Sequence, residues 1–396
     1  MRSILQSALE LQPQTVQDRH FLHEHPELGM DLPVSADYIK TRLRAIGLQP
    51  REICRSGIVA AIGRPGKTIL LRADYDALPI EEQADVPYRS LNPGVMHACG
   101  HDTHASMLLC AAQILKNMED ELSGTVKLMF QPNEENTDKS GSGAAHMVRA
   151  GVLEDPHVDA ALALHMGVPQ KLGTIRGCAG PTNTSLDSFV IRIQGKGGHG
   201  AMPHACVDPI NAGVHIHLAL QELISRETPP WDTVSLTVGA FHAGDAANVI
   251  PDTAELRGTM RTYNQQTRQH LRERMTVVTE GVAAAYGAQA HVDFIQQMDA
   301  CCTDAAFLDA IKPFVTEILG AENCEFQAPP IMPSEDFSEI SSRVPSAYLT
   351  LGFGDESEGC CYAGHHPKVV LRDDGMPYGA AVLANCAVEW LKKVSG

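Results

Sequence analysis

The sequence predicts an α/β protein that combines a mostly parallel sheet with a smaller, inserted α+β domain. The first observation is that short apolar runs alternate with stretches of apolar residues at helical spacing, which is typical of parallel strands covered by helices. The second is that a middle segment follows the order β-α-β-β-α-β, the split ferredoxin-like pattern. We therefore expect one domain built from residues 1–183 and 299–396, with a second domain, residues 184–298, inserted into it.

Length and composition agree with this two-domain interpretation. The chain has 396 residues, more than one ordinary core accommodates, and it is 44% hydrophobic and 20% charged, as in soluble globular proteins. The formal net charge of -17 argues against a nucleic-acid or anionic-membrane partner, because both attract basic patches. No apolar stretch is long enough to span a bilayer, and the first segment, which carries Glu10, lacks the apolar core of a secretion signal. The eleven cysteines include no C-x-x-C pair, which favours a reducing, cytoplasmic location.

The first domain should begin with helices, which extend to about Leu48 around a loop at His25-Pro26-Glu27. Two short strands then flank a turn at residues 63–66, where two glycines and a proline interrupt the apolar runs. Segments with helical spacing and buried apolar runs alternate after that turn. The expected elements are strands at 58–62 and 68–72, a helix at 104–116, a strand at 125–130, a helix at 143–150 and a strand at 160–164.

The pattern changes near Thr184, where the inserted domain should start. Alternating polar and apolar residues indicate its strands, and longer segments with helical spacing indicate its two helices. In chain order we expect a strand at 188–194, a helix at 208–222, strands at 233–240 and 254–262, a helix at 265–286 and a strand at 291–297. Helices and strands return after residue 299, and we expect them to complete the first domain.

Side chains of the metal-ligand type follow several of the expected strands. In open parallel sheets the functional loops lie at the carboxyl ends of the strands, so groups far apart in the sequence converge there. Two histidines near the C-terminus are further candidates. The set consists of Asp74, Asp76, His97, Cys99, His101, Asp102, His104, Glu134, Glu135 and His165, with His365 and His366 from the C-terminal segment.

The residue types in this set suit a transition-metal site. Thiolate and imidazole are ligands that Zn²⁺ and similar ions prefer. Cys99 and His101 lie two positions apart, so in an irregular loop both could reach one ion. In the pair Glu134-Glu135, one carboxylate can bind metal while its neighbour transfers protons. Metal-assisted hydrolysis requires this division, because the ion acidifies a water and a carboxylate carries its proton to the leaving amine.

Each part of the set also has an ordinary structural explanation. Adjacent glutamates usually form a solvated turn, and Asp74 and Asp76 could be turn formers, helix caps or partners of the ligands rather than ligands. The density of residues 97–104 favours a metal site, since three histidines, a cysteine and an aspartate fall within eight positions. A purely structural zinc site is disfavoured, because such sites usually use four Cys or His ligands at short spacings.

Several longer motifs extend the pattern over nearly the whole chain. They are Leu71-Arg72-Ala73-Asp74-Tyr75-Asp76-Ala77-Leu78-Pro79, residues 97–104, Gln131-Pro132-Asn133-Glu134-Glu135, Leu164-His165, Gly197-Gly198-His199-Gly200-Ala201-Met202-Pro203-His204, Asn248-Val249-Ile250-Pro251-Asp252 and Ser334-Glu335-Asp336-Phe337. In these motifs and their order the chain resembles the M20 metallopeptidase family. Within it, the chain is most similar to the amidohydrolase branch of hippurate hydrolases, N-acyl-amino-acid deacylases and plant hydrolases of indole-acetic-acid conjugates.

The resemblance implies a metallopeptidase-like catalytic domain at 1–183 and 299–396, with a ferredoxin-like lid at 184–298 that commonly also forms the dimer interface. It makes Glu134 the general base and acid. It also implies a site for two divalent ions per subunit, with Cys99, His101, Glu135, His165 and a C-terminal histidine as ligands. Manganese, zinc, cobalt and nickel all suit such ligands.

The family's C-terminal motif selects His365 over His366, because Pro367 and Met376-Pro377 follow at the family's spacing. Asn133 stands where many relatives have alanine, and its place beside Glu134 could alter substrate contacts or be neutral.

In the lid, the resemblance makes His199 the residue that stabilises the oxyanion, often in the active site of a partner subunit, and it places Asn248 at the substrate site. Arg257 and Arg261 could bind a substrate carboxylate, since guanidinium matches carboxylate geometry, or could form ordinary surface salt bridges, and we take Arg257 as the substrate-binding candidate.

The resulting hypothesis is a cytoplasmic homodimer, joined through the lid, that hydrolyses the amide bond of N-acyl or conjugated amino acids to a carboxylic acid and a free amino acid. Its partner would be a small-molecule substrate, with no nucleic acid and no membrane. The alternatives are a dipeptidase or exopeptidase of the same fold and a non-catalytic ligand-binding relative. Cys99 favours the amidohydrolase branch by resemblance, and the intact Glu134 with its full ligand set argues against a non-catalytic protein.

Overall fold

The computed structural model describes residues 3–136 and 141–395. The chain forms two compact units, each described here by itself. Unit 1 comprises Met1–Thr182, Cys302–Pro330 and Asp336–Gly396, and unit 2 comprises Asn183–Cys301 and Ile331–Glu335. The short segment Ile331–Glu335 lies within the range that the sequence assigns to the first domain, whereas in the structure it belongs to unit 2.

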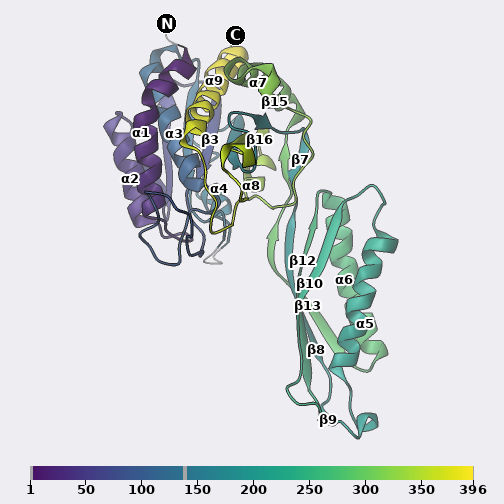
Figure 1. Cartoon of the computed structure of the whole chain (residues 1–396). Coiled ribbons are helices and arrows are strands. Elements are labelled where there is room, and N and C mark those ends of the chain that lie inside the picture. The colour runs from purple at the N-terminus through teal and green to yellow at the C-terminus, as the bar shows by residue number, and fades with distance from the viewer. Residues whose placement is uncertain (1–2, 137–140, 396) are drawn as a thin grey trace. The chain divides into compact units, whose positions relative to one another are not determined.

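Unit 1 contains an eight-stranded sheet in the order β1-β2-β4-β3-β5-β16-β6-β15 (Figure 1). Its central strands β4, β3, β5 and β16 pair in parallel, while β2 and β6 join them through antiparallel pairs. This arrangement confirms the predicted α/β class with a mostly parallel sheet. The strands are β1 (Arg51–Cys54), β2 (Gly57–Gly63), β3 (Thr68–Asp74), β4 (Thr125–Gln131), β5 (Ala160–Gly167), β6 (Ile175–Arg176), β15 (Cys324–Glu325) and β16 (Ser346–Gly352).

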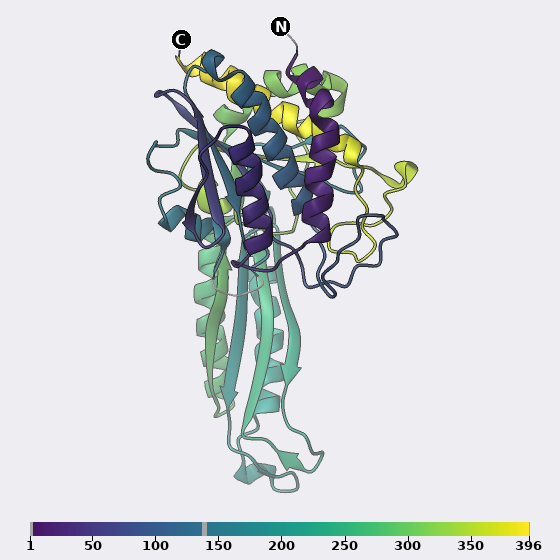
Figure 2. The ribbon, with the colours of Figure 1, turned by 90° about the vertical axis from the view of Figure 1, so that its left-hand side faces the viewer.

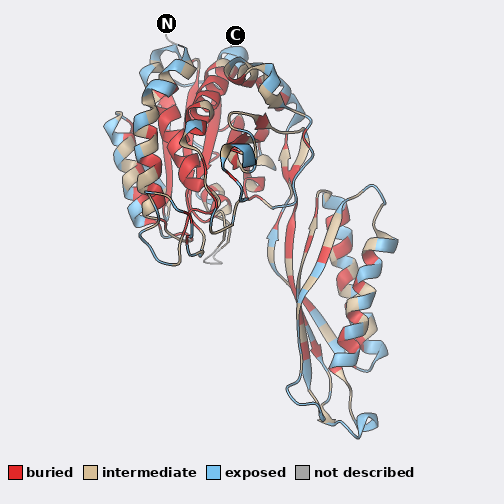
Figure 3. Ribbon diagram, viewed as in Figure 1, coloured by how far each residue is buried: buried red, intermediate tan, exposed pale blue. Residues whose placement is uncertain are grey.

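Helices cover this sheet. Every residue of β3 and β4 is buried, the pattern of strands that are covered on both faces (Figure 3). Helices α3 and α9 pack against β3, and α1 packs against both of them (Figure 2). No helix among the described residues is long and apolar enough to cross a membrane. The helices of unit 1 are α1 (Ile4–Glu24), α2 (Pro33–Ala45), α3 (His101–Asn117), α4 (Gly143–Arg149), α7 (Ala305–Leu319), α8 (Ser338–Ser341) and α9 (Met376–Ser395).

Helix α3 begins three residues earlier than the sequence predicts. Its first residue is His101, so the placement of this histidine in an irregular loop is wrong. The preceding Gly100 has φ 70° and ψ 21°, a left-handed conformation that glycine adopts without steric cost. A Cβ at this position would also lie 2.6 Å from Leu371 and 2.7 Å from Met166. Gly100 therefore turns the chain sharply, and Cys99 and His101 lie on either side of that turn.

Unit 2 contains a four-stranded antiparallel sheet in the order β10-β12-β8-β13, with helices α5 and α6 packed on it. Its chain order confirms the β-α-β-β-α-β pattern. Residues alternate along β12, where Leu256 and Met260 are buried and Arg257 and Arg261 point to the opposite face. The elements are β8 (Leu186–Gln194), β9 (Gly198–His199), α5 (Pro209–Glu222), β10 (Val234–His242), β11 (Val249–Ile250), β12 (Thr253–Thr262), α6 (Gln265–Ala285) and β13 (Gln289–Met298). Strands β7 (Gly180–Asn183) and β14 (Cys301–Thr303) pair in a separate two-stranded sheet, and most of their residues belong to unit 1.

Candidate metal centre

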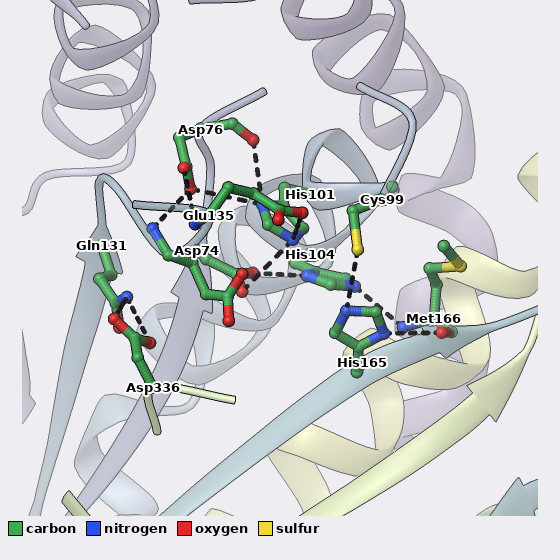
Figure 4. A network of polar contacts seen from close by, with 12 residues as sticks. Asp74, Asp76, Cys99, His101, His104, Gln131, Glu135, His165, Met166 and Asp336 are labelled. Atoms are coloured by element: carbon green, nitrogen blue, oxygen red, sulfur yellow. Dashed lines mark hydrogen bonds and ion pairs between the residues drawn. The ribbon is translucent and has the colours of Figure 1, made fainter. Parts of the chain in front are cut away.

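The carboxyl ends of three neighbouring parallel strands in unit 1 gather the predicted ligands. Strand β3 ends at Asp74, Glu134 and Glu135 follow β4, and His165 lies near the end of β5. The first turn of α3 adds His101 (Figure 4).

Ligand atoms of these residues lie close enough to share metal ions. Within 4.8 Å of one another are atoms of Cys99, His101 and His165, and the same holds for Cys99, Glu135 and His365. A third group of this kind joins His101 to Glu134 and Glu135. The structure thus brings all five predicted ligands, and the predicted base, into one cluster.

His101 at the start of α3 and His165 in β5 are oriented as metal ligands. Nδ1 of His101 lies 3.0 Å from the carbonyl oxygen of Asp76, and Nδ1 of His165 lies 2.7 Å from that of Met166. Each Nδ1 therefore donates to a carbonyl, which leaves Nε2 for an ion, the usual arrangement of ligating histidines. Nε2 of His101 is buried and has no hydrogen-bond partner among the described residues. Nε2 of His165 faces the Cys99 sulfur at 3.5 Å.

The electrostatics of the cluster also suit a cation. Burial and Glu135 raise the pKa of the Cys99 thiol, but His165 and His101 outweigh them and lower it to about 6. Burial lowers the pKa of His165, yet Cys99 raises it to about 9. Hydrogen bonds to Cys99 and Glu135 raise the pKa of His365 to about 10. The Cys99 thiolate and the Glu135 carboxylate thus favour positive charge beside them. Either a protonated imidazole or a metal ion can supply that charge.

Of the two C-terminal histidines, His365 joins the cluster. Its Nε2 lies 3.2 Å from Oε1 of Glu135, and its backbone N–H donates to Ala98 at 2.8 Å. His366 instead accepts a hydrogen bond from the backbone of Lys368 at 3.1 Å and stacks on Tyr362. This geometry agrees with the selection of His365 from the motif spacing.

Asp76 supports the glutamates. It is fully buried, and its two carboxylate oxygens accept hydrogen bonds from the backbone N–H groups of Glu134 at 3.0 Å and Glu135 at 3.1 Å. Because both consecutive amides are held by one carboxylate, Asp76 fixes the main chain from which the two glutamates project.

His104 supports the strand that carries His165. Its Nδ1 lies 2.5 Å from Asp74, and its Nε2 accepts from the backbone of Met166 at 2.9 Å. Burial lowers the pKa of His104 to about 4, so the ring is neutral at neutral pH. With both ring nitrogens engaged, His104 connects Asp74 to strand β5 next to His165.

The dense block at 97–104 is therefore not all one metal site. Asp102 accepts hydrogen bonds from Arg19 at 3.1 Å and from His23 at 2.9 Å. His97 is buried, and neither ring nitrogen has a hydrogen-bond partner among the residues the structure describes. Burial lowers its pKa to about 3, so His97 is a neutral core residue. Local density in the sequence therefore gave more candidate ligands than the cluster contains, because the Asp102 side chain bonds to residues of α1 and His97 is buried without a hydrogen-bond partner among the described residues.

In unit 2, the predicted lid residues lie on a short two-stranded ribbon. Strand β9 pairs with β11, where His199 faces Val249, and Asn248 directly precedes β11. Nδ1 of His199 accepts from the backbone N–H of Ala201 at 3.1 Å, so the proton of the neutral ring resides on Nε2. His199 and Asn248 are both exposed. The ribbon therefore presents a hydrogen-bond donor at its surface.

The two lid arginines differ in their partners. Nε of Arg257 donates to Glu255 at 2.6 Å, and the Arg257 side chain is exposed. Arg261 donates to the Ser334 hydroxyl at 2.6 Å and contacts no carboxylate among the described residues. Burial alone lowers the pKa of Arg261. A half-buried guanidinium without an acid partner is a better anion site than one already paired.

The sequence assigned no role to one buried aspartate, Asp336. Asp336 lies in the Ser-Glu-Asp-Phe motif, yet the motif itself gives no partner for it. In the structure it contacts Gln131 at the end of β4 (Figure 4). Only its place in a matched motif signalled importance, because its partners are more than 190 positions away.

The sheet and its cluster of thiolate, imidazole and carboxylate ligands define the class of metal-dependent peptidases and amidohydrolases. The chain belongs to peptidase family M20/M25/M40, whose model matches residues 70–389. The resemblance found in the motifs is thereby confirmed.

Relatives within the family have several activities. The chain is 34% identical to thermostable carboxypeptidase 2 of Saccharolobus solfataricus, with 97% of each chain covered. It is 36% identical to IAA-amino acid hydrolase ILR1-like 4 of Arabidopsis thaliana, covering 94% of this chain and 84% of the relative. It is 35% identical to N-acetyl-L-cysteine deacetylase of Bacillus subtilis, covering 91% and 84%. Among solved structures, the YXEP protein of Bacillus subtilis, described as a dinuclear metal-binding peptidase, is similar with a TM-score of 0.82, 32% identity and coverage of 97% and 99%.

Proposed function

We propose that this protein is a metal-dependent amidohydrolase that cleaves the amide bond of N-acyl amino acids and releases a carboxylic acid and a free amino acid. The observation that carries the proposal is that Glu134 forms a group of neighbouring ligand atoms with His101 and Glu135, which in turn share such groups with Cys99. Two of the similar proteins are named as hydrolases of amino-acid amides, a deacetylase and an IAA-amino acid hydrolase.

Divalent metal ions, two per subunit, would be held by five residues of unit 1. The ligands are Cys99, His101, Glu135, His165 and His365, and manganese, zinc, cobalt and nickel all suit them. When bound, such ions acidify a water molecule and polarise the acyl carbonyl. The similarity to a dinuclear metal-binding peptidase supports two ions.

Glu134 transfers the proton in this proposal. Its carboxylate takes a proton from the attacking water and delivers it to the nitrogen of the departing amino acid. Asp76 fixes the backbone of Glu134 at 3.0 Å, which limits the freedom of this group. His199 would donate a hydrogen bond from its Nε2–H to the developing oxyanion, an interaction worth roughly 3–4 kcal/mol in other hydrolases.

The carboxylate of the amino-acid half is assigned to Arg261. The sequence gives Arg257 as the candidate, but Arg257 is already paired with Glu255. Arg261 has no acid partner in the part of the chain that the structure describes, and we therefore prefer it to Arg257. Asn248 is assigned to the same substrate site because it directly precedes β11, the partner of the strand that carries His199.

A homodimer through unit 2 is supported by an apolar stripe on α5. Ile210, Val214 and Leu218 follow one another at four-residue spacing and are 38%, 44% and 56% exposed. Beside them, β10 is an edge strand of the sheet, and its Phe241 ring lies against Gly213 of α5. An exposed apolar stripe next to an open strand edge is typical of a protein interface. We also propose a cytoplasmic location, because eleven cysteines without a C-x-x-C pair suit a reducing compartment.

A peptidase acting on dipeptides or on a peptide C-terminus is the second candidate, favoured by the similarity to a carboxypeptidase. A non-catalytic binding protein is disfavoured, because it would not need Glu134 beside the ligands.

The test is amino-acid release from a panel of N-acyl amino acids and dipeptides. Wild type and Glu134→Ala are each assayed with Mn²⁺, with Zn²⁺ and with a chelator. We expect metal-dependent release from acyl amino acids that falls at least about 10³-fold in the variant. Faster release from dipeptides would favour the peptidase, and no release from any amide by the metal-loaded wild type would overturn both.

A further inference from the structure

Asp336 is a fully buried carboxylate next to the end of strand β4. It accepts a hydrogen bond from Nη2 of Arg72 at 2.8 Å, and both of its oxygens accept from Nε2 of Gln131 at 2.8 Å. Gln131 is the last residue of β4, so Asp336 holds the point at which the chain leaves the strand toward Glu134.

The same carboxylate holds the point at which the chain enters α4. Oδ2 of Asp336 accepts from the hydroxyl of Ser142 at 2.7 Å and from the backbone N–H of Ala144 at 3.0 Å. Ser142 is the N-cap of α4, and its hydroxyl also accepts from Ala145. One side chain thus binds the chain before and after the two glutamates.

This network also reaches the supports of the metal ligands. Arg72 donates to Oε1 of Gln131 at 2.9 Å and pairs with Asp74 at 2.8 Å. Asp74 in turn contacts His104. A buried carboxylate is stable only when donors surround it, and here the donors come from β3, β4 and the start of α4.

We propose that Asp336 is a positioning residue that fixes the main chain carrying Glu134 and Glu135. The proposal rests on the proposed function of those glutamates. Asp76 holds their amides from one side, at 3.0 and 3.1 Å, and Asp336 anchors the flanking residues from the other. When the main chain is fixed on both sides of Glu134, its carboxylate stays at the reacting atoms. Misplacement of a catalytic group by about 1 Å can lower the rate by on the order of 100-fold.

The variant that tests this is Asp336→Asn, which keeps the size of the side chain. Its amide NH₂ replaces one acceptor oxygen and faces the donors of Arg72 and Gln131, leaving donors without an acceptor. Asp187→Asn is the matched control. Asp187 is also fully buried and accepts from Arg268 at 2.6 and 3.0 Å, but it lies in unit 2.

A second substitution should restore the network. In the double variant Asp336→Asn with Gln131→Glu, the new carboxylate can accept from Arg72 and from the new amide. The negative charge beside Arg72 is thereby kept, but it moves from the side chain at position 336 to the side chain at position 131. A role in positioning predicts recovery in the double variant, whereas simple loss of packing predicts further damage.

Two readouts are needed, both on the full-length, Mn²⁺-loaded protein. Hydrogen–deuterium exchange of the peptide covering residues 125–136 reports the order of the main chain without any substrate. Steady-state kinetics on the best N-acyl amino acid gives kcat and KM separately. For Asp336→Asn we expect faster exchange in this peptide and a kcat lower by on the order of 100-fold with KM little changed. Asp187→Asn should alter neither, and the double variant should recover part of both.

Unchanged exchange and kcat in Asp336→Asn would overturn the proposal, and so would an equal loss in Asp187→Asn. If wild type lacked amidase activity while Asp336→Asn still accelerated exchange, the proposed function would fail and the positioning role would stand.

Should Asp336→Asn not fold, Ser142→Ala removes one hydrogen-bond donor to Asp336 without a change of charge. It must then accelerate exchange in the same peptide, and unchanged exchange would reject the role of Asp336.

Discussion

Arg257 and Arg261 lie on the same face of β12, but only Arg257 is paired with a carboxylate among the described residues. Arg261→Gln should raise the KM for N-acyl amino acids roughly 10- to 100-fold, because it removes a charge-assisted bond to the substrate carboxylate. Arg257→Gln should leave KM nearly unchanged, since Arg257 is paired with Glu255. Steady-state kinetics on both variants checks this, and the reverse ranking would reassign the carboxylate to Arg257.

At the scale of single residues, the sequence identified the members of the cluster better than the contacts that support them. The types and motifs of metal ligands selected four residues that the structure brings together, Cys99, His101, Glu135 and His165. For Asp76 the sequence left ligand and supporting partner as alternatives, and for His104 it gave no partner. Their contacts are with backbone amides of Glu134 and Met166 that only the fold brings near. His97 has the side chain of a ligand, but it is buried and belongs to none of the groups of neighbouring ligand atoms among the described residues.

Helices α1 and α3 are joined by a buried histidine with two acidic partners. Nδ1 of His23 lies 2.9 Å from Asp102 and its Nε2 lies 3.2 Å from Glu82. Burial lowers the pKa of His23 and Arg19 lowers it slightly further, but Asp102 and Glu82 outweigh both and raise it to about 9. With two carboxylates as acceptors, the ring is an imidazolium at neutral pH.

This link predicts a pH dependence of stability. Because the folded pKa of about 9 exceeds the unfolded value of about 6.5, the stabilisation is full below pH 6.5 and is lost as pH rises through 9. The free energy of unfolding of unit 1 should fall by on the order of 3 kcal/mol over that range. Urea denaturation of the metal-loaded protein at several pH values measures it. His23→Gln should flatten this dependence, and an equally steep curve in the variant would assign it to another group.

The exposed stripe on α5 gives a prediction at the same scale. Val214→Glu should convert a dimer into a monomer, because a buried, unpaired carboxylate at an interface is strongly unfavourable. Light scattering after gel filtration measures the mass of both proteins. Val277→Glu, at a 57% exposed position on α6, is the control and should remain a dimer. A monomeric wild type, or dissociation of both variants, would remove α5 from the interface.

At the scale of the whole molecule, the residues that the structure describes form two separate hydrophobic cores, one in each unit. Every candidate ligand lies on unit 1, so metal binding should stabilise that unit alone. At a metal concentration about 1,000 times Kd the gain is about 4 kcal/mol, or roughly 10 °C in its Tm. Calorimetry with Mn²⁺ and with a chelator should therefore show one transition that moves and one that does not. Equal movement of both would mean that the units unfold together.

At this scale the sequence predicted the α/β class and the inserted β-α-β-β-α-β pattern, because hydrophobic periodicity is local. It did not predict the strand order of the eight-stranded sheet or the short strands β1, β6 and β15. Strands of two to four residues leave no periodicity to detect, and pairing between distant strands depends on tertiary packing.

The candidate ligands are spread along the chain, yet Cys99, Glu135 and His365 have ligand atoms within 4.8 Å of one another in the folded protein. An unfolded chain offers no such cluster, so binding of an ion to it would be coupled to the folding of unit 1. A protease cuts the opened chain rather than the folded one, and the rate at which it digests unit 1 should therefore fall as the supply of metal ions rises.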